Sequence, residues 1–416
     1  MAYFGGNDPL YKKYAAPVVV DQTGNATYSL NILSTYLPIV YDVTWAGDLT
    51  TDPIAKKRMK AEVYYGSTNV LLGTQIKTSI LVGGINTYRF NVAEMLKTTL
   101  NSEIYNNITS DQINTGNDNI VMPYYIVYTP MYIDILGVER EDDSLTDSTA
   151  YCTSAIKQNL VSSKIFSNSD TYVTRDSFGS TKKFLTNAPN NKKIRANETE
   201  QLTFFNLSFT DTIELNYTVY NLAGTPTNYT KSLVDCTAYK YGTLTISDST
   251  ASCLLNGISA ISKLDVWLEN NSGVVLSETR TYIIDNKCSD GYRLVWVNEF
   301  GATDKYTFDA HKSRNFKVDE REVYKTPIQN EPSISDRSLK VLGTKGGYSY
   351  SCTSKFIAGD LDWFTELLTT NECYWEKEAN VLVPIIITSS DQVIEDNTGL
   401  INVTIDFKTS QEHITR

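Results

Sequence analysis

The strongest candidate for chemistry in this 416-residue chain is the pair Asn298-Glu299, which follows the apolar run 294–297. An Asn-Glu pair at a strand end is typical of many retaining glycosidases, in which the glutamate donates a proton. That mechanism needs a second carboxylate about 5 Å away, and the sequence identifies none. The usual scaffold is a β/α barrel, whose eight strand and helix units are missing here. We therefore interpret Glu299 as the end of a hairpin strand, with glycosidase activity as the weaker alternative.

The two histidines are the remaining candidates for a catalytic base. His311 lies between Ala310 and Lys312, a setting typical of a solvated loop, and His413 is among the last four residues. A general base must be held in a packed pocket, which neither setting provides. We expect no catalytic residues and no enzymatic activity.

Ligand spacing indicates neither a metal site nor a phosphate site. The acidic stretch 139–147 lacks the repeated Asp-x-Asp-x-Asp-Gly pattern of a calcium loop, so we predict an exposed loop there. Residues 343–347, Gly-Thr-Lys-Gly-Gly, predict a glycine-rich turn without the lysine position of a phosphate-binding loop. We expect no metal and no cofactor.

The cysteines do not have the spacing of a zinc site, because none forms a Cys-x-x-Cys pair or adjoins a histidine. We predict reduced, half-buried thiols. Cys236 and Cys253 could pair in an oxidising medium, and their spacing alone does not decide this. The six cysteines are Cys152, Cys236, Cys253, Cys288, Cys352 and Cys373.

The chain is acidic, with a formal net charge of −11. Binding to phosphates depends mostly on Lys and Arg, so this charge argues against wrapping nucleic acid. An acidic surface could instead suit a channel through which DNA slides without sticking. The longest apolar run, 381–387, is far shorter than the roughly 20 residues that span a bilayer, and the N-terminus lacks a signal-peptide pattern. We expect no membrane segment and no export by that route.

Alternating apolar and polar residues predict half-buried strands, because successive side chains of a strand point to opposite faces. The clearest runs are 213–219, 264–268 and 401–407. The continuous apolar runs 294–297 and 383–387 predict strands buried on both faces, and Pro384 favours a strand start or an edge. The 28 tyrosines, against 14 phenylalanines, also favour sheets and interfaces.

A β-hairpin is predicted around residues 294–308. The apolar strand 294–297 leads to Phe300-Gly301, where glycine supplies the backbone freedom for a turn, and 306–308 begins the next strand. Trp296, Phe300 and Phe308 would supply its apolar area.

Two segments have helical spacing. The first spans 91–100 and begins with Asn91 as a cap, and the second spans 360–368 behind Asp360. The apolar face of the first would consist of Val92, Met95, Leu96 and Leu100. That of the second would consist of Leu361, Phe364 and Leu368.

These patterns predict a multi-domain, mainly β protein with β-sandwich-like domains and a few isolated helices. We expect an N-terminal β-rich domain at 1–138, a connecting segment at 139–183, a central β-sandwich-like domain at 184–310 and a C-terminal β-rich domain at 311–416. The last boundary rests on the change from apolar pattern to mixed charge at 311–322.

Several segments, taken in order, resemble virion structural proteins of tailed phages. They are 184–189 (FLTNAP), 292–308, the helix from Leu361, and the strands 381–388 and 401–407. In this order they are similar to ring and collar proteins of short-tailed crAss-like phages, over roughly residues 184–416. The segment 90–100 is also similar to a helix that closes the first domain of such proteins.

This resemblance implies a non-catalytic subunit of the virion neck or tail, assembled in the host cytoplasm. It would form a cyclic homo-oligomer, contact other ring, portal or tail proteins, and let genomic DNA pass without specific binding. The alternative is a glycan- or receptor-binding β-sandwich protein of a tail fibre or bacterial surface, whose exposed Trp and Tyr would stack on sugar rings.

Overall fold

The fold is described from a computed structural model. The described residues are 18–22, 32–34, 39–45, 55–66, 68–82, 85–100, 113–114, 121–134, 136–147, 150–153, 164–166, 183–195, 198–206, 213–232, 240–247, 261–270, 272–285, 291–325, 339–354, 362–370, 372–378, 381–389, 402–410 and 413–415.

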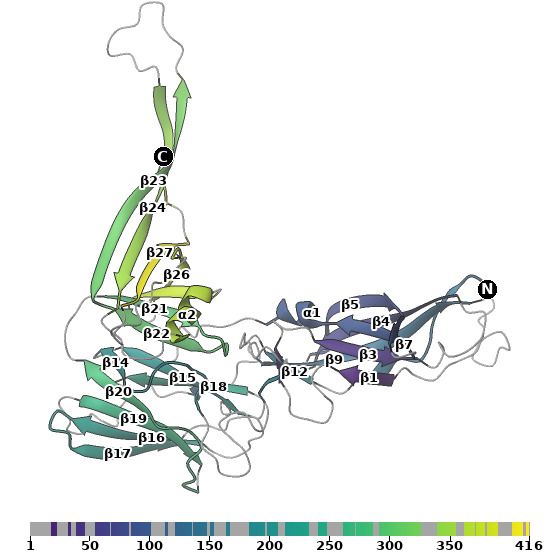
Figure 1. Cartoon of the computed structure of the whole chain (residues 1–416), viewed down its shortest axis with the longest axis horizontal. Coiled ribbons are helices and arrows are strands. Elements are labelled where there is room, and N and C mark those ends of the chain that lie inside the picture. Colours follow the sequence, from purple (N-terminus) through teal and green to yellow (C-terminus); the bar gives the residue numbers. More distant parts are fainter. Residues whose placement is uncertain are drawn as a thin grey trace, which may run out of the picture.

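The protein is mainly β and multi-domain, as the sequence predicts. The described residues contain 28 strands and two helices, and three separate hydrophobic cores. Figure 1 shows the N-terminal domain at one end of the long axis, and the central and C-terminal domains side by side at the other.

The N-terminal domain contains two sheets. One has the strand order β1 (Val18–Gln22), β3 (Val40–Thr44), β7 (Ile85–Asn91) and β6 (Ile80–Val82). The other has the order β13 (Lys164–Phe166), β2 (Ile32–Ser34), β12 (Ala150–Thr153), β9 (Val121–Ile133), β4 (Ala55–Tyr65) and β5 (Val70–Thr78), with β10 (Glu139–Glu141) and β11 (Leu145–Thr146) also paired to β9.

Several tyrosines are buried in the N-terminal core, as expected for a chain rich in tyrosine and in β-sheet. Tyr41 and Tyr124 are fully buried, and their hydroxyl oxygens lie 2.7 Å apart, so each ring packs while the phenols satisfy one another. Tyr128 lies against Tyr41 and Phe90 in the same core.

The central domain is a sandwich of two sheets. The first has the order β14 (Lys192–Arg195), β20 (Arg280–Asp285), β19 (Ile261–Asn270), β16 (Ile213–Asn221) and β17 (Pro226–Ser232). The second has the order β15 (Thr199–Asn206), β18 (Lys240–Ser247) and β8 (Ile113–Asn114). The predicted alternation is confirmed, because the apolar positions of 213–219 and 264–268 are all buried between these sheets.

The C-terminal domain contains one eight-stranded sheet. Its order is β22 (Thr303–Phe308), β21 (Tyr292–Val297), β25 (Cys373–Glu378), β26 (Val381–Ile387), β27 (Thr404–Thr409), β24 (Leu339–Thr353) and β23 (His311–Lys325), and β28 (His413–Thr415) pairs with β24. The predicted hairpin is β21 and β22, with Gly301 at φ 75° in the turn and Trp296, Phe300 and Phe308 fully buried.

Both helices are present but shorter than, or shifted from, their predicted bounds. Helix α1 spans Ala93–Lys97, and Asn91 ends β7 while its side-chain oxygen accepts the N–H of Ala93 at 3.2 Å. Helix α2 spans Asp362–Thr369, and the predicted cap Asp360 lies outside the described residues. The predicted face of α1 is confirmed by the burial of Val92, Leu96 and Leu100.

The domain boundaries differ from the predicted ones. Strands β10 and β11 in the stretch 139–147, predicted to be an exposed loop, pair with β9, and Cys152 lies in the N-terminal core. The charge that suggested a loop is matched across the sheet, because Glu139 contacts Arg58 and Glu141 Oε1 lies 2.8 Å from the Nζ atom of Lys60. The described strands of 139–183 therefore belong to the N-terminal domain.

The boundary predicted at 310/311 also lies elsewhere. Strands β21 and β22 share a sheet with β23 and β24, and Leu294, Trp296 and Phe308 lie in the C-terminal core. The mixed charge at 311–322 marks a strand that leaves the core, so it is not a domain junction.

Strand β26 is another correction, because it is not buried on both faces. Val381 and Ile386 are exposed and Ile385 is buried. Pro384 lies within the strand, and β27 pairs with β26 only from Ile385 onward. Pro384, which has no N–H group to donate, therefore lies just before the residues of β26 that pair with β27.

Candidate assembly surface

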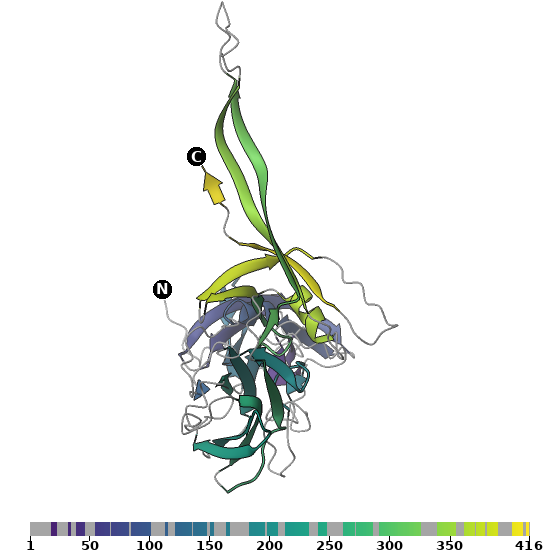
Figure 2. The same ribbon diagram turned by 90° about the vertical axis from the view of Figure 1, so that its left-hand side faces the viewer.

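A long β-hairpin, formed by β23 and β24, projects from the C-terminal domain. Figures 1 and 2 show its outer end projecting beyond the other described strands in two perpendicular views. Each strand has 15 residues, and pairing runs from His311 opposite Thr353 to Lys325 opposite Leu339. The predicted glycine-rich turn at 343–347 is wrong, since these residues lie inside β24.

The base of the hairpin is anchored in the C-terminal core. Residues 349–353 of β24 pair with β27, Cys352 is fully buried, and the ring of Tyr350 stacks on that of Phe407 with centroids 5.1 Å apart. The guanidinium of Arg314 lies 3.6 Å from the centre of the Tyr348 ring, an arrangement that favours cation–π attraction. These contacts fix the direction in which the hairpin leaves the domain.

Large apolar side chains are exposed along the hairpin. Phe316 lies opposite Tyr348 with ring centroids 4.9 Å apart, and Val323 lies opposite Val341, so each pair shares one face of the ribbon. The exposed fractions of the apolar side chains run from 37 to 57%. The residues are Phe316, Val318, Val323, Tyr324, Leu339, Val341 and Leu342.

An isolated two-stranded hairpin is marginally stable in water, and contiguous exposed apolar side chains mark interaction sites. The hairpin therefore has the physical character of an arm that packs against another surface.

The hairpin is also basic in an acidic protein. Its two strands contain seven Lys and Arg and three Asp and Glu, so their formal net charge is +4. The rest of the chain contains 30 Lys and Arg and 45 Asp and Glu, a net charge of −15. This contrast favours an acidic partner surface.

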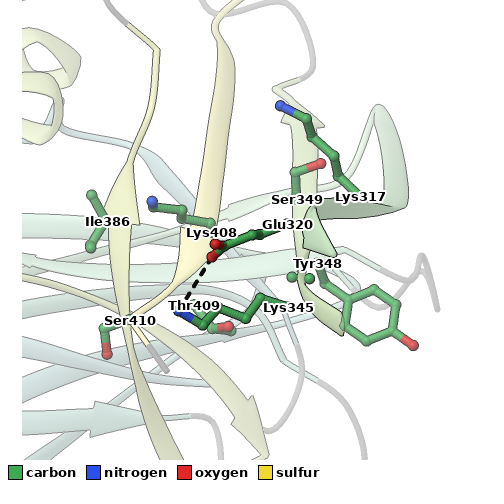
Figure 3. Close-up of a pocket in the computed structure, with 11 residues that line it drawn as sticks. Lys317, Glu320, Lys345, Tyr348, Ser349, Ile386, Lys408, Thr409 and Ser410 are labelled. Atoms are coloured by element: carbon green, nitrogen blue, oxygen red, sulfur yellow. Dashed lines mark ion pairs between the residues drawn. The ribbon is translucent and has the colours of Figure 1, made fainter. Parts of the chain in front are cut away.

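A groove of about 480 Å³ lies beside the base of the hairpin, between β24 and the strands β26 and β27 (Figure 3). Lys317, Lys345 and Lys408 surround it, and Lys345 Nζ lies 3.3 Å from the Oε2 atom of Glu320. Its polar side chains are exposed or half-buried, and it therefore lacks the enclosed polar groups typical of a small-molecule site.

A buried ionic network joins the central domain to the C-terminal domain that carries the hairpin. Arg293 of β21 donates to Glu198 at 2.7 Å, to Glu200 at 3.1 Å and to Glu376 at 2.9 Å. Burial opposes its charge, but the three carboxylates together raise the pKa of Arg293 above its ordinary value. Lys192 donates to Glu200 at 2.6 Å from within the same network.

Asp304 is the second centre of this interface. Its carboxylate accepts hydrogen bonds from Thr186 at 2.7 Å, Asn298 at 3.1 Å and Trp363 at 2.9 Å. Burial raises the pKa of Asp304 even though Lys192 and these donors favour the charged form. Because the donors come from the linker at 183–191, the β21–β22 turn and α2, Asp304 ties three segments together.

The pair Asn298-Glu299, which the sequence offered as a candidate for glycosidase chemistry, lies in this interface. The side-chain oxygen of Asn298 accepts the N–H groups of Phe300 and Ala302, both at 3.0 Å, so Asn298 holds the hairpin turn. The amide of Asn187 donates to Glu299 at 2.7 Å and to Glu366 at 2.5 Å.

Glu366 is a carboxylate near Glu299 that sequence reasoning missed. The two accepting oxygens lie at most 5.2 Å apart, the sum of 2.7 and 2.5 Å. The amide nitrogen of Asn187 lies between them, in the place where a glycosidic oxygen would be needed. This arrangement favours a structural role for Glu299. No spacing in the sequence links residues 187, 299 and 366, so only the fold could reveal the cluster.

Each of the two histidines is the first residue of a strand. His311 is exposed at the start of β23, and His413 begins β28. Cys152, Cys352 and Cys373 are free and buried, more deeply than predicted, and burial raises the pKa of each thiol. Cys236 and Cys253, together with Cys288, lie outside the described residues.

The described part of the chain contains neither a cluster of metal ligands nor a helix that could span a membrane. No group of three or more His, Cys, Asp or Glu is arranged to hold a metal ion there. Neither α1 nor α2 has the length and apolar character that crossing a bilayer requires.

Comparisons with known proteins give weak matches in structure alone. No protein-family model and no curated protein sequence matches the chain. The chain is similar to the full extracellular region of Plexin A4 in two structures, at 7% identity and a TM-score of 0.18, covering 91% of this chain and 35% or 30% of those chains. A third structure, titled pT26-6p, is 8% identical with a TM-score of 0.15 and covers 66% of this chain and 67% of that one.

This chain therefore spans about a third of the Plexin A4 chains it matches. Similarity at these TM-scores carries no argument about fold or function.

Proposed function

We propose that this protein is a non-catalytic structural subunit that assembles into a ring in the neck or tail of a tailed-bacteriophage virion. The hairpin of β23 and β24 is the arm through which it contacts its neighbours. The observation that carries this proposal is the row of exposed apolar side chains on a ribbon that projects from the fold. The order of the segments that resemble crAss-like ring and collar proteins supports the virion setting.

The buried network at the root of the arm supports the same function. The hairpin can hold a neighbouring subunit in a fixed position only when the C-terminal domain that carries it is itself held rigidly. Arg293 and Asp304 supply that rigidity by joining the central and C-terminal domains through charge-assisted hydrogen bonds. In a ring, genomic DNA would pass a mostly acidic protein without binding it specifically.

The tryptophans do not favour the glycan-binding alternative. Sugar-binding surfaces present exposed aromatic rings. Trp45, Trp296 and Trp363 are buried, and Trp267 and Trp375 are half-buried. Trp375 packs against the C-terminal core, and the indole N–H of Trp267 is bonded to Glu269 at 2.7 Å.

Negative-stain electron microscopy of the purified protein tests the proposal. We expect closed rings for the natural chain, and dispersed single subunits for the double variant Val323→Glu/Val341→Glu, which places like charges opposite each other on the arm. Leu222→Glu, at an exposed apolar position of the central domain, is the matched control and should still form rings. Single subunits that bind glycans would sink the proposal.

A further inference from the structure

We propose that Lys192 and Glu200 condense spontaneously into an amide bond that cross-links the two sheets of the central domain. The Nζ atom of Lys192 and the Oε2 atom of Glu200 lie 2.6 Å apart. Only 4% of the surface of each side chain is exposed. The bond forms within one chain, so this inference does not depend on the proposed assembly.

The fold brings the two side chains together from different sheets. Lys192 is the first residue of β14, an edge strand of the five-stranded sheet, and Glu200 is the second residue of β15 in the three-stranded sheet. The Nζ atom of Lys192 also donates to the backbone oxygen of Lys305 in β22. The amine is therefore held from two sides against the carboxyl group, and fixed reactants of this kind react far faster than free ones.

The surroundings favour the neutral amine, which is the nucleophilic form of lysine. Burial lowers the pKa of Lys192, although the negative charges of Glu200 and Asp304 oppose this effect. The Nζ atom lies at most about 3.8 Å from the carboxyl carbon of Glu200, because a C–O bond adds only about 1.2 Å to the 2.6 Å contact. The amine is thus within reach of the carbon that it must attack.

Arg293 activates the carboxyl group from its other side. Its guanidinium donates to the Oε1 atom of Glu200 at 3.1 Å. A positively charged donor at this oxygen stabilises the negative charge that develops there when the amine attacks the carbon. The two oxygens of Glu200 therefore have different roles: Oε1 stays as the amide oxygen, and Oε2, beside the amine, leaves.

The reaction is a condensation, and it needs no oxidant or reductant. The bond between Nζ and the carboxyl carbon forms, and the bond between that carbon and Oε2 breaks. Of the three protons of the Lys192 ammonium, one stays on the amide nitrogen and two move to Oε2, which leaves as water. The positive charge of Lys192 and the negative charge of Glu200 disappear together, so the net charge of the network is unchanged.

The product fits the hydrogen bonds that are already present. The N–H of the amide donates to the backbone oxygen of Lys305, and the amide oxygen accepts from Arg293. A buried ion pair retains the cost of removing two charges from water, whereas an amide with both polar groups hydrogen-bonded does not. Exclusion of water from the site also disfavours hydrolysis of the bond.

The mass of the denatured natural chain tests this inference. After allowance for processing of the N-terminus, we expect a mass lower by one water molecule than that of the 46.7 kDa sequence. Tryptic digestion should give a branched peptide, in which residues 184–193 are joined through Lys192 to residues 196–231 through Glu200. A chain with its full sequence mass, or with water lost at another position, would overturn the inference.

Two variants complete the test. Lys192→Met should have its full sequence mass, because a thioether cannot attack the carboxyl group. Lys60→Met is the matched control, since Lys60 lies 2.8 Å from the Oε1 atom of Glu141 in an exposed ion pair, and this variant should still lose one water molecule. Water loss that persists in Lys192→Met contradicts the cross-link. The branched peptide is sought in the natural chain, so misfolding of a variant cannot imitate the expected result.

Discussion

Arg293 is a buried cation at the contact between the central and C-terminal domains. Its guanidinium is buried and contacts carboxylates from β15, from the segment before it and from β25. Removing one partner of a buried ionic group leaves the others buried without their counter-charge, which costs about 3 to 5 kcal/mol. We predict a loss of that size for Arg293→Ala.

Chemical unfolding followed by tryptophan fluorescence measures this loss, because Trp296 and Trp363 lie in the C-terminal core. Arg89→Ala is the matched control, since Arg89 pairs with Asp42 from a side chain that is half exposed, and such pairs contribute less than about 1 kcal/mol. Equal stability of the two variants would contradict the role given to Arg293.

Glu366 predicts a pH dependence of stability. Burial, and then the negative charge of Asp304, raise the pKa of Glu366 to about 8 from an ordinary value of 4.5, and the amide of Asn187 only partly offsets this. A group whose folded pKa is raised stabilises the fold fully below its unfolded pKa, and this contribution is lost as pH rises through the folded pKa. The natural chain should therefore lose stability, on the order of 5 kcal/mol, as the pH rises from about 4.5 to about 8.

The variant Glu366→Gln should remove this slope, because an amide has no proton to lose in that range. Unfolding curves of both proteins across the same pH range give the comparison, with Glu94→Gln as an exposed control. A variant whose stability falls with pH as steeply as that of the natural chain would show that Glu366 is not the responsible group.

At the scale of elements, the hairpin of β23 and β24 has two parts with different support. The base pairs with β27 and contributes Tyr350 and Cys352 to the C-terminal core. The outer part pairs with β28 at residues 344–346, and no other described strand pairs with it beyond its own partner. A two-stranded ribbon without such support opens easily, and its amides exchange with solvent.

Hydrogen exchange followed by mass spectrometry should show this difference. Amides of residues 320–325 and 339–343 should exchange fast in dilute monomer and slowly in the assembled protein, while residues 349–353 should be protected in both. Exchange at the outer hairpin that does not change on assembly would argue against its burial in a contact.

Much of the fold could be predicted from periodicity, because side-chain alternation reports burial directly. The run 213–219 and the β21–β22 hairpin were both identified in this way. The long hairpin was missed, although Phe316 and Val318 alternate with polar residues and Tyr348, Tyr350 and Cys352 alternate with serines. The mixed charge of residues 311–322 suggested a domain junction, and the glycines at 343–347 suggested a turn.

The buried network could not be predicted from sequence. Its members are spread over residues 186–376, and a charged side chain has the same local signature whether it faces water or a partner across a domain interface. The central and C-terminal domains therefore had to be folded and docked before Arg293, Asp304 and Glu366 could be recognised as interior groups.

For the whole molecule, the separation of charge is the feature most relevant to assembly. The arm has a formal net charge of +4 and the rest of the chain one of −15. In the assembly that we propose, the arm would attract the acidic bodies of other copies, while those bodies would repel one another. Added salt screens both effects, and the arm contact, which is the attractive one, should weaken.

The molar mass of the purified chain in solution tests assembly through the arm most directly. Sedimentation at about 50 mM salt should give a discrete multiple of 46.7 kDa, and the mass should fall toward that of one chain at about 500 mM salt or in the Val323→Glu/Val341→Glu variant. A mass of 46.7 kDa at every salt and protein concentration, in the natural chain, would contradict the account.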